Sequence, residues 1–140
     1  MEITTKDIEE RFRRYNKDYF AGELPTPRFG LIESYTTCGY FSCSRIVGRR
    51  RLRGQLIEIS SYYDWEEDEL RDVIVHEMIH YYLAYKHIDN TISHGDAFRE
   101  MADEFNSTYG LNIREKVDCT KFRKTKNAPK IKWFLTQLFY

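Results

Sequence analysis

Residues 70–84 of this 140-residue chain, Leu-Arg-Asp-Val-Ile-Val-His-Glu-Met-Ile-His-Tyr-Tyr-Leu-Ala, determine its architecture. Apolar side chains in this stretch cover nearly every face of a helix with 3.6 residues per turn, and a helix of that kind is buried. We expect the helix to begin near Asp64, where acidic residues crowd the first turn, as the helix dipole favours. Within residues 73–80, the centre of this stretch, three titratable residues interrupt the apolar run: His76, Glu77 and His80.

The spacing of His76 and His80 predicts a metal site. Side chains four residues apart project from one face of a helix, so both imidazoles can reach one zinc ion at about 2.0–2.1 Å. The carboxylate of Glu77 can reach a metal-bound water without ligating the metal, and zinc lowers the pKa of that water towards about 7. Burying these groups without a partner is unfavourable, and a zinc ion with its water offsets that cost. The alternative is that they are satisfied core or interface histidines.

A catalytic zinc site needs a third protein ligand. His87 is nearest in sequence, but at 1.5 Å per residue it lies about 16 Å along the helix from His76, so an exposed or capping role suits it better. His94 begins a further helix, expected between about Ser93 and Gly110, and falls on the apolar stripe of that helix. We therefore expect His94 to complete the site; the alternative is an N-cap histidine without metal. Weaker ligand candidates on the same helix are Glu100 and Glu104.

The rest of the pattern predicts an α+β domain. A first amphipathic helix is expected from about Thr5 to Phe20, because apolar residues recur on one of its faces. Short β-prone runs punctuated by glycines between Arg28 and Tyr63 predict about three strands. We expect a small, mainly antiparallel sheet, backed by the helix that carries His76 and flanked by the two other helices. An edge strand of such a sheet could hold an extended peptide by backbone pairing.

The charges give no global field, because 22 basic and 22 acidic residues cancel. Two stretches are locally basic: Arg45–Arg53 holds five arginines, and Lys121–Lys132 holds six lysines or arginines. Basic stretches are usually solvated surface, but they can also contact the phosphates of a nucleic acid. Both interpretations stay open for these two.

The three cysteines, Cys38, Cys43 and Cys119, are too few and odd in number for a disulfide framework. We interpret Cys38 and Cys43 as small core residues. The N-terminus has no apolar signal region, and no apolar run is long enough to span a bilayer. We therefore expect a cytoplasmic protein without membrane contact.

Several of these motifs occur together in a known family. They are the run His76–His80, the pair His94–Gly95 with Phe98 four residues after the histidine, the opening segment Tyr15–Pro25 and the strand Ile57–Ser60. In this combination the chain resembles the SprT-like zinc metalloproteases over about residues 5–110. The long spacing to the third histidine is discriminating, because metzincins place theirs six residues after the second, where this chain has Lys86.

The resemblance implies a zincin-like fold and one zinc ion held by His76, His80 and His94. It also implies Glu77 as the general base of peptide-bond hydrolysis. The eukaryotic members of the family cleave proteins crosslinked to DNA, so the resemblance extends the expected substrates to DNA-associated proteins.

The C-terminal part departs from the family pattern. Many members add a zinc ribbon with two cysteine pairs, whereas three residues after Cys119 this chain has Phe122. We therefore expect an SprT-like metalloprotease domain over residues 1–115. Residues 116–140 are expected to form a basic tail or a degenerate ribbon remnant packed on that domain.

The rival hypothesis is a non-catalytic DNA- or protein-binding module with a structural zinc ion. Glu77 distinguishes the hydrolase from the binding module. A structural zinc site closes its fourth position with a protein ligand and has no use for a carboxylate beside the metal. The residue that would stabilise the oxyanion is not selected by the sequence. Three nearby tyrosines are candidates: Tyr81, Tyr82 and Tyr85.

Overall fold

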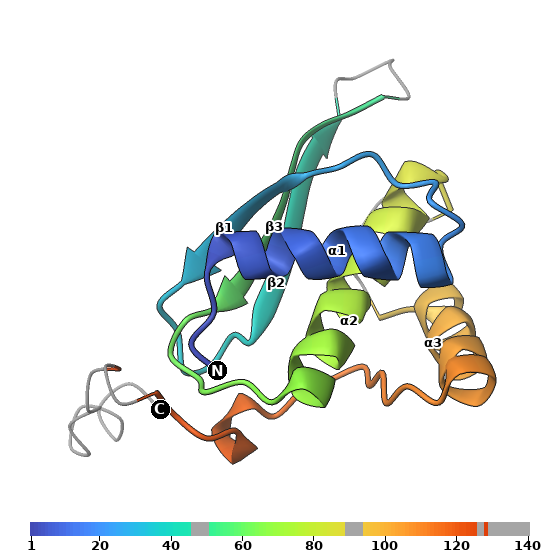
Figure 1. Cartoon of the computed structure of the whole chain (residues 1–140). Coiled ribbons are helices and arrows are strands. Elements are labelled where there is room, and N and C mark those ends of the chain that lie inside the picture. The colour runs from blue at the N-terminus through green and yellow to red at the C-terminus, as the bar shows by residue number, and fades with distance from the viewer. Residues whose placement is uncertain (46–50, 89–93, 126–127, 129–140) are drawn as a thin grey trace.

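The computed structural model describes residues 1–45, 51–88, 94–125 and 128. Parts of both basic stretches, the expected helix start at Ser93 and most of the expected C-terminal tail lie outside these residues. The elements, in chain order, are α1 (Thr5–Tyr19), β1 (Arg28–Ile32), β2 (Gly39–Arg45), β3 (Leu52–Ser60), α2 (Glu67–Tyr85), α3 (Asp96–Tyr109) and the short 3₁₀ helix η1 (Cys119–Lys121) (Figure 1). Three helices and a three-stranded sheet confirm the predicted α+β class.

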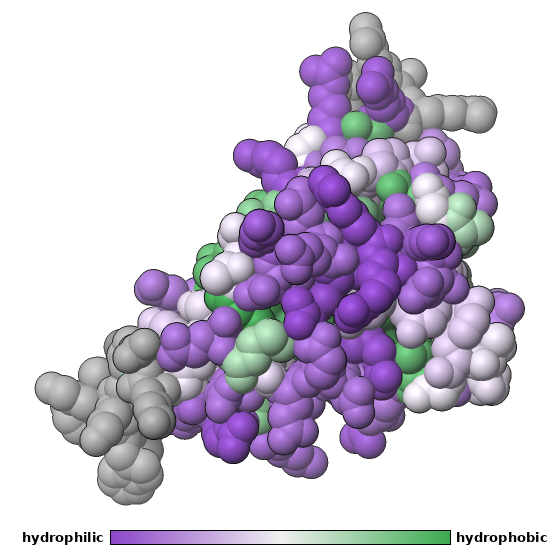
Figure 2. All heavy atoms as spheres, viewed as in Figure 1, coloured by the Kyte–Doolittle hydropathy of each residue, from purple (hydrophilic) through white to green (hydrophobic). Residues whose placement is uncertain are grey.

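Helix α1 forms where the period predicts it. Thr4 caps its N-terminus in a capping box with Asp7: the backbone N–H of Asp7 donates to Thr4 Oγ1 and that of Thr4 to Asp7 Oδ2. Its buried side chains, Ile8, Phe12 and Tyr15, recur three or four residues apart on one face. The opposite face is polar, and the face of the molecule that carries α1 is largely hydrophilic in Figure 2. The apolar face of α1 therefore points into the core.

The sheet has the strand order β1-β3-β2 and is mixed. Strands β2 and β3 pair antiparallel, from Gly39 opposite Ile59 to Arg45 opposite Leu52, whereas β1 pairs parallel with β3. Because β3 inserts between the first two strands, β1 and β2 run in opposite directions without touching. The parallel pair departs from the expected, mainly antiparallel sheet, since the sequence pattern shows strands but not which of them become neighbours.

Helix α2 is buried almost all round, as its apolar sequence predicts, and packs against β2, β3, α1 and α3. It begins at Glu67, three residues after the expected start at Asp64. Trp65, which the prediction placed in the first turn, lies before the helix and is buried, and its indole Nε1 donates to the carbonyl of Ser60 at 2.8 Å. The helix is then capped by Glu66, whose backbone N–H donates to the side chain of Glu69 at 3.0 Å. The fully buried residues of α2 include Leu70, Ile74, Val75, Met78 and Ile79.

Helix α3 packs on α2 and ends as predicted at Gly110, which has φ 70° and forms a left-handed cap. The following chain returns past the N-terminal end of α2 (Figure 1) and buries Leu111 and Ile113 on the way. Phe122 then packs on the ring of Trp65, with a centroid distance of 4.9 Å. This return places residues after 110 beside the start of α2, although they are far from it in sequence. None of the helices in the described part is long and apolar enough to cross a membrane.

Candidate metal centre

Three histidines converge where α2 meets the start of α3. His76 and His80 lie one turn apart on α2, and His94 lies two residues before the first residue of α3. The Nε2 atoms of His76 and His80 are 3.3 Å apart, and the Nε2 of His94 lies 3.1 Å from each of them. The structure thus brings together the three residues that the sequence selected. His87, just beyond α2, is exposed and lies outside this group.

The spacing of these nitrogens fits a tetrahedral cation. With metal–nitrogen bonds of about 2.0–2.1 Å, two nitrogens on a tetrahedral zinc ion are about 3.3 Å apart. The 3.1–3.3 Å between the three Nε2 atoms matches that value. Without a cation, three ring nitrogens facing one point would set lone pairs or N–H groups against one another. Imidazole is also the commonest protein ligand for such metals. The group is therefore able to hold a metal ion.

His76 and His94 are held in the neutral form that binds metals. Burial is the main cause that lowers the pKa of His76, to about 3, and the neighbouring His80 and His94 act in the same direction. Burial also lowers the pKa of His94, with Lys116 adding to the effect and Glu115 opposing it. Protons therefore compete weakly for these nitrogens at neutral pH, which favours metal binding.

The carboxylate of Glu77 lies beside the three nitrogens without joining them. Its Oε2 is 3.9 Å from the Nε2 of His76, and Glu77 is not among the residues whose ligand atoms converge, but the carboxylate is close enough to reach a water on a metal held by the histidines. The side chain is buried, and burial raises its pKa to about 8, whereas a hydrogen bond with the backbone of Phe41 acts in the opposite direction. A carboxyl with a raised pKa is suited to take up and release protons near neutral pH.

Gly39, the first residue of β2, leaves the space that the side chain of Glu77 occupies. A Cβ at position 39 would lie 2.8 Å from Val73 Cγ1 and 3.3 Å from Glu77 Oε2. Any larger residue would therefore push against α2 at the turn that carries the carboxylate. The sequence showed Gly39 only as punctuation before a strand, because its role depends on a helix, α2, that begins 28 residues later.

In the metal-free protein, Glu77→Gln is expected to stabilise the fold, and to do so more at pH 8 than at pH 5. The pKa of Glu77 is about 8 in the folded protein, whereas the ordinary value of 4.5 applies to the unfolded chain. Between these two pH values the carboxyl is therefore protonated in the folded protein and ionised in the unfolded chain. Its free energy of unfolding therefore falls as the pH rises through this window, by up to about 1.4 kcal/mol per pH unit. Glutamine does not titrate. Urea unfolding of both metal-free proteins at the two pH values measures the difference, and a gap independent of pH would contradict it.

An open cleft of about 340 Å³ leads to the site. One wall is the chain entering β2, residues 36–39, and the other is the returning chain at residues 115–117. Between the walls lie Val73, His76 and Glu77 of α2, with His94 beside them. The cleft gives a ligand access to His76, to His94 and to the carboxylate of Glu77 from the same side.

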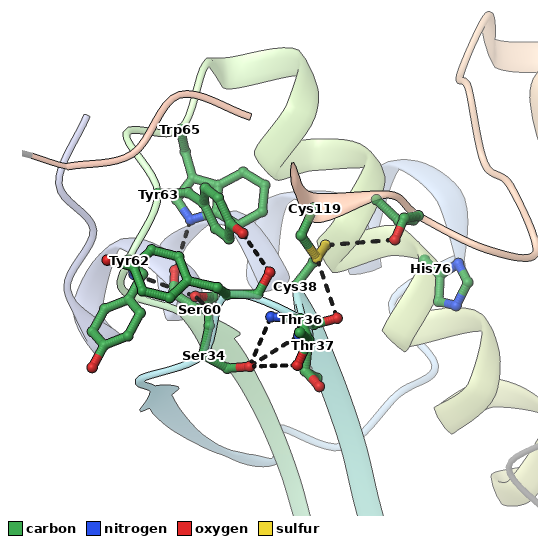
Figure 3. Close-up of a disulfide and its surroundings, with 12 residues drawn as sticks. Ser34, Thr36, Thr37, Cys38, Ser60, Tyr62, Tyr63, Trp65, His76 and Cys119 are labelled. Atoms are coloured by element: carbon green, nitrogen blue, oxygen red, sulfur yellow. Dashed lines mark hydrogen bonds between the residues drawn. A yellow bond between two sulfur atoms is a disulfide. The ribbon is translucent and has the colours of Figure 1, made fainter. Parts of the chain in front are cut away.

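A disulfide joins the two walls. Cys38 and Cys119 are cross-linked across 81 residues, with 5.6 Å between their Cα atoms, and His76 lies close by (Figure 3). The Sγ of Cys119 also lies 3.7 Å from the carbonyl oxygen of Thr36 in the facing wall. Cys38 is buried in the core as expected, but it is cross-linked to Cys119, which the sequence interpretation did not include. The pairing arises only once the chain after α3 returns to β2, and nothing in the spacing of the cysteines shows it. Cys43 is free and half-buried.

The three tyrosines considered for the oxyanion do not line this cleft. Tyr81 is buried in the core, where its hydroxyl donates to the carbonyl of Pro25 at 2.7 Å. Tyr82 packs on Phe20, and Tyr85 packs against the ring of Tyr81. Among the described residues of the cleft, the only lysine is Lys116.

The described ends of the two basic stretches have different surroundings. Arg45 donates to the carbonyl of Ala84 at 2.7 Å, so it caps the C-terminal end of α2. Arg51 and Arg53 are exposed. In the second stretch, the ammonium of Lys124 lies 4.9 Å from the centre of the Tyr35 ring. Nucleic-acid contact through either stretch stays a prediction.

The fold and the site together define an α+β protein with a three-histidine metal-binding group beside an open cleft. Within that class, the chain belongs to the SprT-like family, whose family model matches residues 8–121. The match confirms the resemblance seen in the motifs and points to a metalloprotease type of function. Comparison with curated proteins and with solved structures found no match.

Proposed function

We propose that this protein is a zinc-dependent endopeptidase that uses the SprT-like form of the HExxH site. The observation that carries the proposal is the convergence of three Nε2 atoms at tetrahedral spacing with the carboxylate of Glu77 3.9 Å from one of them. His76, His80 and His94 would hold the ion. Membership of the SprT-like family supports peptidase chemistry at such a centre.

When bound, zinc supplies Lewis-acid polarisation of the scissile carbonyl and acidifies the attacking water. The protein supplies the proton transfers. The Oε2 of Glu77 accepts the proton of the water and, after attack, delivers it to the leaving amide nitrogen. Its position beside the histidines suits both steps, because the carboxylate lies within reach of the attacking water and of the leaving nitrogen. The packing of Gly39 against α2 keeps the carboxylate at this position.

The sheet offers a place for an extended substrate. Strand β2 is an edge strand, and no described strand pairs with its outer side. Its first residue, Gly39, also lines the cleft beside Glu77. A peptide added along β2 by backbone hydrogen bonds would reach the cleft with its own backbone extended. We therefore propose a protein or an unfolded peptide segment as substrate.

The alternative function is a non-catalytic module with a structural zinc ion. Structural sites close the fourth position with a protein ligand, whereas the described residues bring three ligands together and leave a cleft beside them. Contact with DNA through the basic stretches, and a cytoplasmic location, are further proposals that the activity itself does not require.

The test is cleavage of casein by the zinc-loaded protein, with and without single-stranded DNA. We expect cleavage that 1,10-phenanthroline abolishes and that added zinc restores. The variant Glu77→Gln, prepared in the same way, should retain zinc but not cleave. Bound zinc without cleavage under any of these conditions would overturn the proposal in favour of the binding module.

A further inference from the structure

The side chain of Arg99, in the first turn of α3, ties together three parts of the chain near the candidate metal centre. Its Nη1 donates to the backbone carbonyl of His94 at 3.1 Å and to Glu115 Oε1 at 2.9 Å. Its Nη2 is paired with Asp96. One guanidinium therefore holds the backbone of a proposed metal ligand, the start of α3 and the returning chain that forms one wall of the cleft.

Of the three histidines, His94 depends most on the hydrogen bond from Arg99. His76 and His80 are fixed by the backbone hydrogen bonds of α2, in which both are internal residues. His94 precedes α3, whose N-cap is Gly95, so the regular helix does not hold it. The hydrogen bond from Arg99 to its carbonyl is a direct restraint on the backbone of this residue.

Glu115 connects this restraint to a firmly held part of the molecule. It lies on the cleft wall four residues before Cys119, whose disulfide to Cys38 joins that wall to the chain entering β2. Ile113, two residues before Glu115, is buried, and its backbone N–H and carbonyl both bond to the side chain of Asn106 on α3. Glu115, the partner of Arg99, is thus held on both sides in the sequence: by the bonds of Ile113 to Asn106 before it and by the disulfide of Cys119 after it.

We infer that Arg99 and Glu115 form a positioning pair for the third metal ligand. By fixing the backbone of His94 against the disulfide-anchored wall, the pair keeps its Nε2 at the distance from His76 and His80 that a tetrahedral ion needs. Neither side chain belongs to the three-histidine group. This inference rests on the proposed metal-binding function and adds two residues to the part of the chain that determines metal affinity.

An ordinary surface ion pair would not have this effect. Arg99 and Glu115 are about half exposed, and exposed pairs contribute little to the stability of a fold. Arg13 and Glu9 of α1 form such a pair at 3.2 Å, with no contact to the metal centre, and provide the matched control. A positioning role predicts weaker metal binding without a comparable loss of stability, whereas a merely structural role does not.

The experiment measures the zinc dissociation constant of the metal-free protein by competition with a chromophoric chelator. We expect Arg99→Gln to weaken zinc binding about tenfold, since residues that orient metal ligands typically affect affinity by about 10- to 100-fold. Glu115→Gln should weaken it by less, because Arg99 would still reach the carbonyl of His94. Arg99→Lys should restore part of the loss, and Arg13→Gln should bind zinc like the wild type.

Two further measurements distinguish a positioning role from a merely structural one. Because the two residues act as a unit, the double variant Arg99→Gln/Glu115→Gln should lose no more than Arg99→Gln alone. The absorption of bound Co²⁺ should also lose tetrahedral intensity in Arg99→Gln. Wild-type affinity in Arg99→Gln, within about twofold, would overturn the positioning role. Failure of the wild type itself to bind zinc would instead overturn the proposed function.

Discussion

Replacing Glu77 by glutamine is expected to lower kcat for peptide hydrolysis by a factor of about 10²–10⁴, which is the usual contribution of a general base. Glutamine has nearly the shape of glutamate, so it fits the space against Gly39 and leaves the three histidines in place. It cannot accept the proton of the attacking water. We therefore expect the loss in kcat, with zinc content unchanged and KM little altered.

His87→Gln is the matched control for this variant. His87 is an exposed histidine just beyond α2 and lies outside the histidine group. It should be cleavage-competent with wild-type zinc content. Activity of Glu77→Gln within threefold of the wild type would contradict the role of Glu77. A loss of zinc together with activity would show that the carboxylate holds the metal, whereas the ligand atoms that converge in the structure are those of the three histidines without Glu77.

Breaking the disulfide is expected to lower the free energy of unfolding by roughly 2–5 kcal/mol. The cross-link closes a loop of 81 residues between Cys38 and Cys119, and the entropy that a disulfide removes from the unfolded chain grows with the length of the loop. It also holds the wall that carries Glu115. Urea unfolding of Cys119→Ser, compared with the oxidised wild type, measures the effect.

Cys43→Ser is the control for the disulfide, because Cys43 is the free cysteine of the chain and lies on the same strand region as Cys38. It should change stability far less than Cys119→Ser. Thiol titration of the denatured, unreduced wild type should find one free thiol per chain, from Cys43. Three free thiols in freshly purified protein would show that the cross-link does not form.

The disulfide also bears on the expected location. A low and odd number of cysteines suggested a reducing compartment, yet disulfides persist mainly in oxidising ones. The cytoplasmic location therefore remains a prediction that the thiol titration above would inform.

The parts of the fold that local periodicity controls were predictable from the sequence. The buried helix through His76 and His80, the capped amphipathic helix near the N-terminus and the end of α3 at Gly110 all follow from spacing and capping residues. The three histidines could be chosen because helical spacing brings two of them together, and because the apolar stripe of the next helix turns the third inward.

Features that depend on contacts between distant segments were not predictable in this way. The parallel pairing of β1 with β3, the disulfide and the tie between Arg99 and Glu115 all join residues whose local sequences are unremarkable. The position of Gly39 against α2 belongs to the same group, since its close approach to Val73 appears only when the helix has packed on the sheet. Periodicity identifies the elements and their faces, but their partners are selected by the packing of the whole core.

The central claim is that His76, His80 and His94 hold one zinc ion, and it is tested most directly by the metal content of two purified proteins. Elemental analysis of the wild type and of His94→Ala, after the same dialysis against a weak chelator, compares the sites with three ligands and with two. The geometry predicts about one zinc ion per wild-type chain and little or none in His94→Ala, because two imidazoles alone bind zinc weakly. A wild type without zinc, or a His94→Ala variant that keeps a full equivalent, would contradict the account.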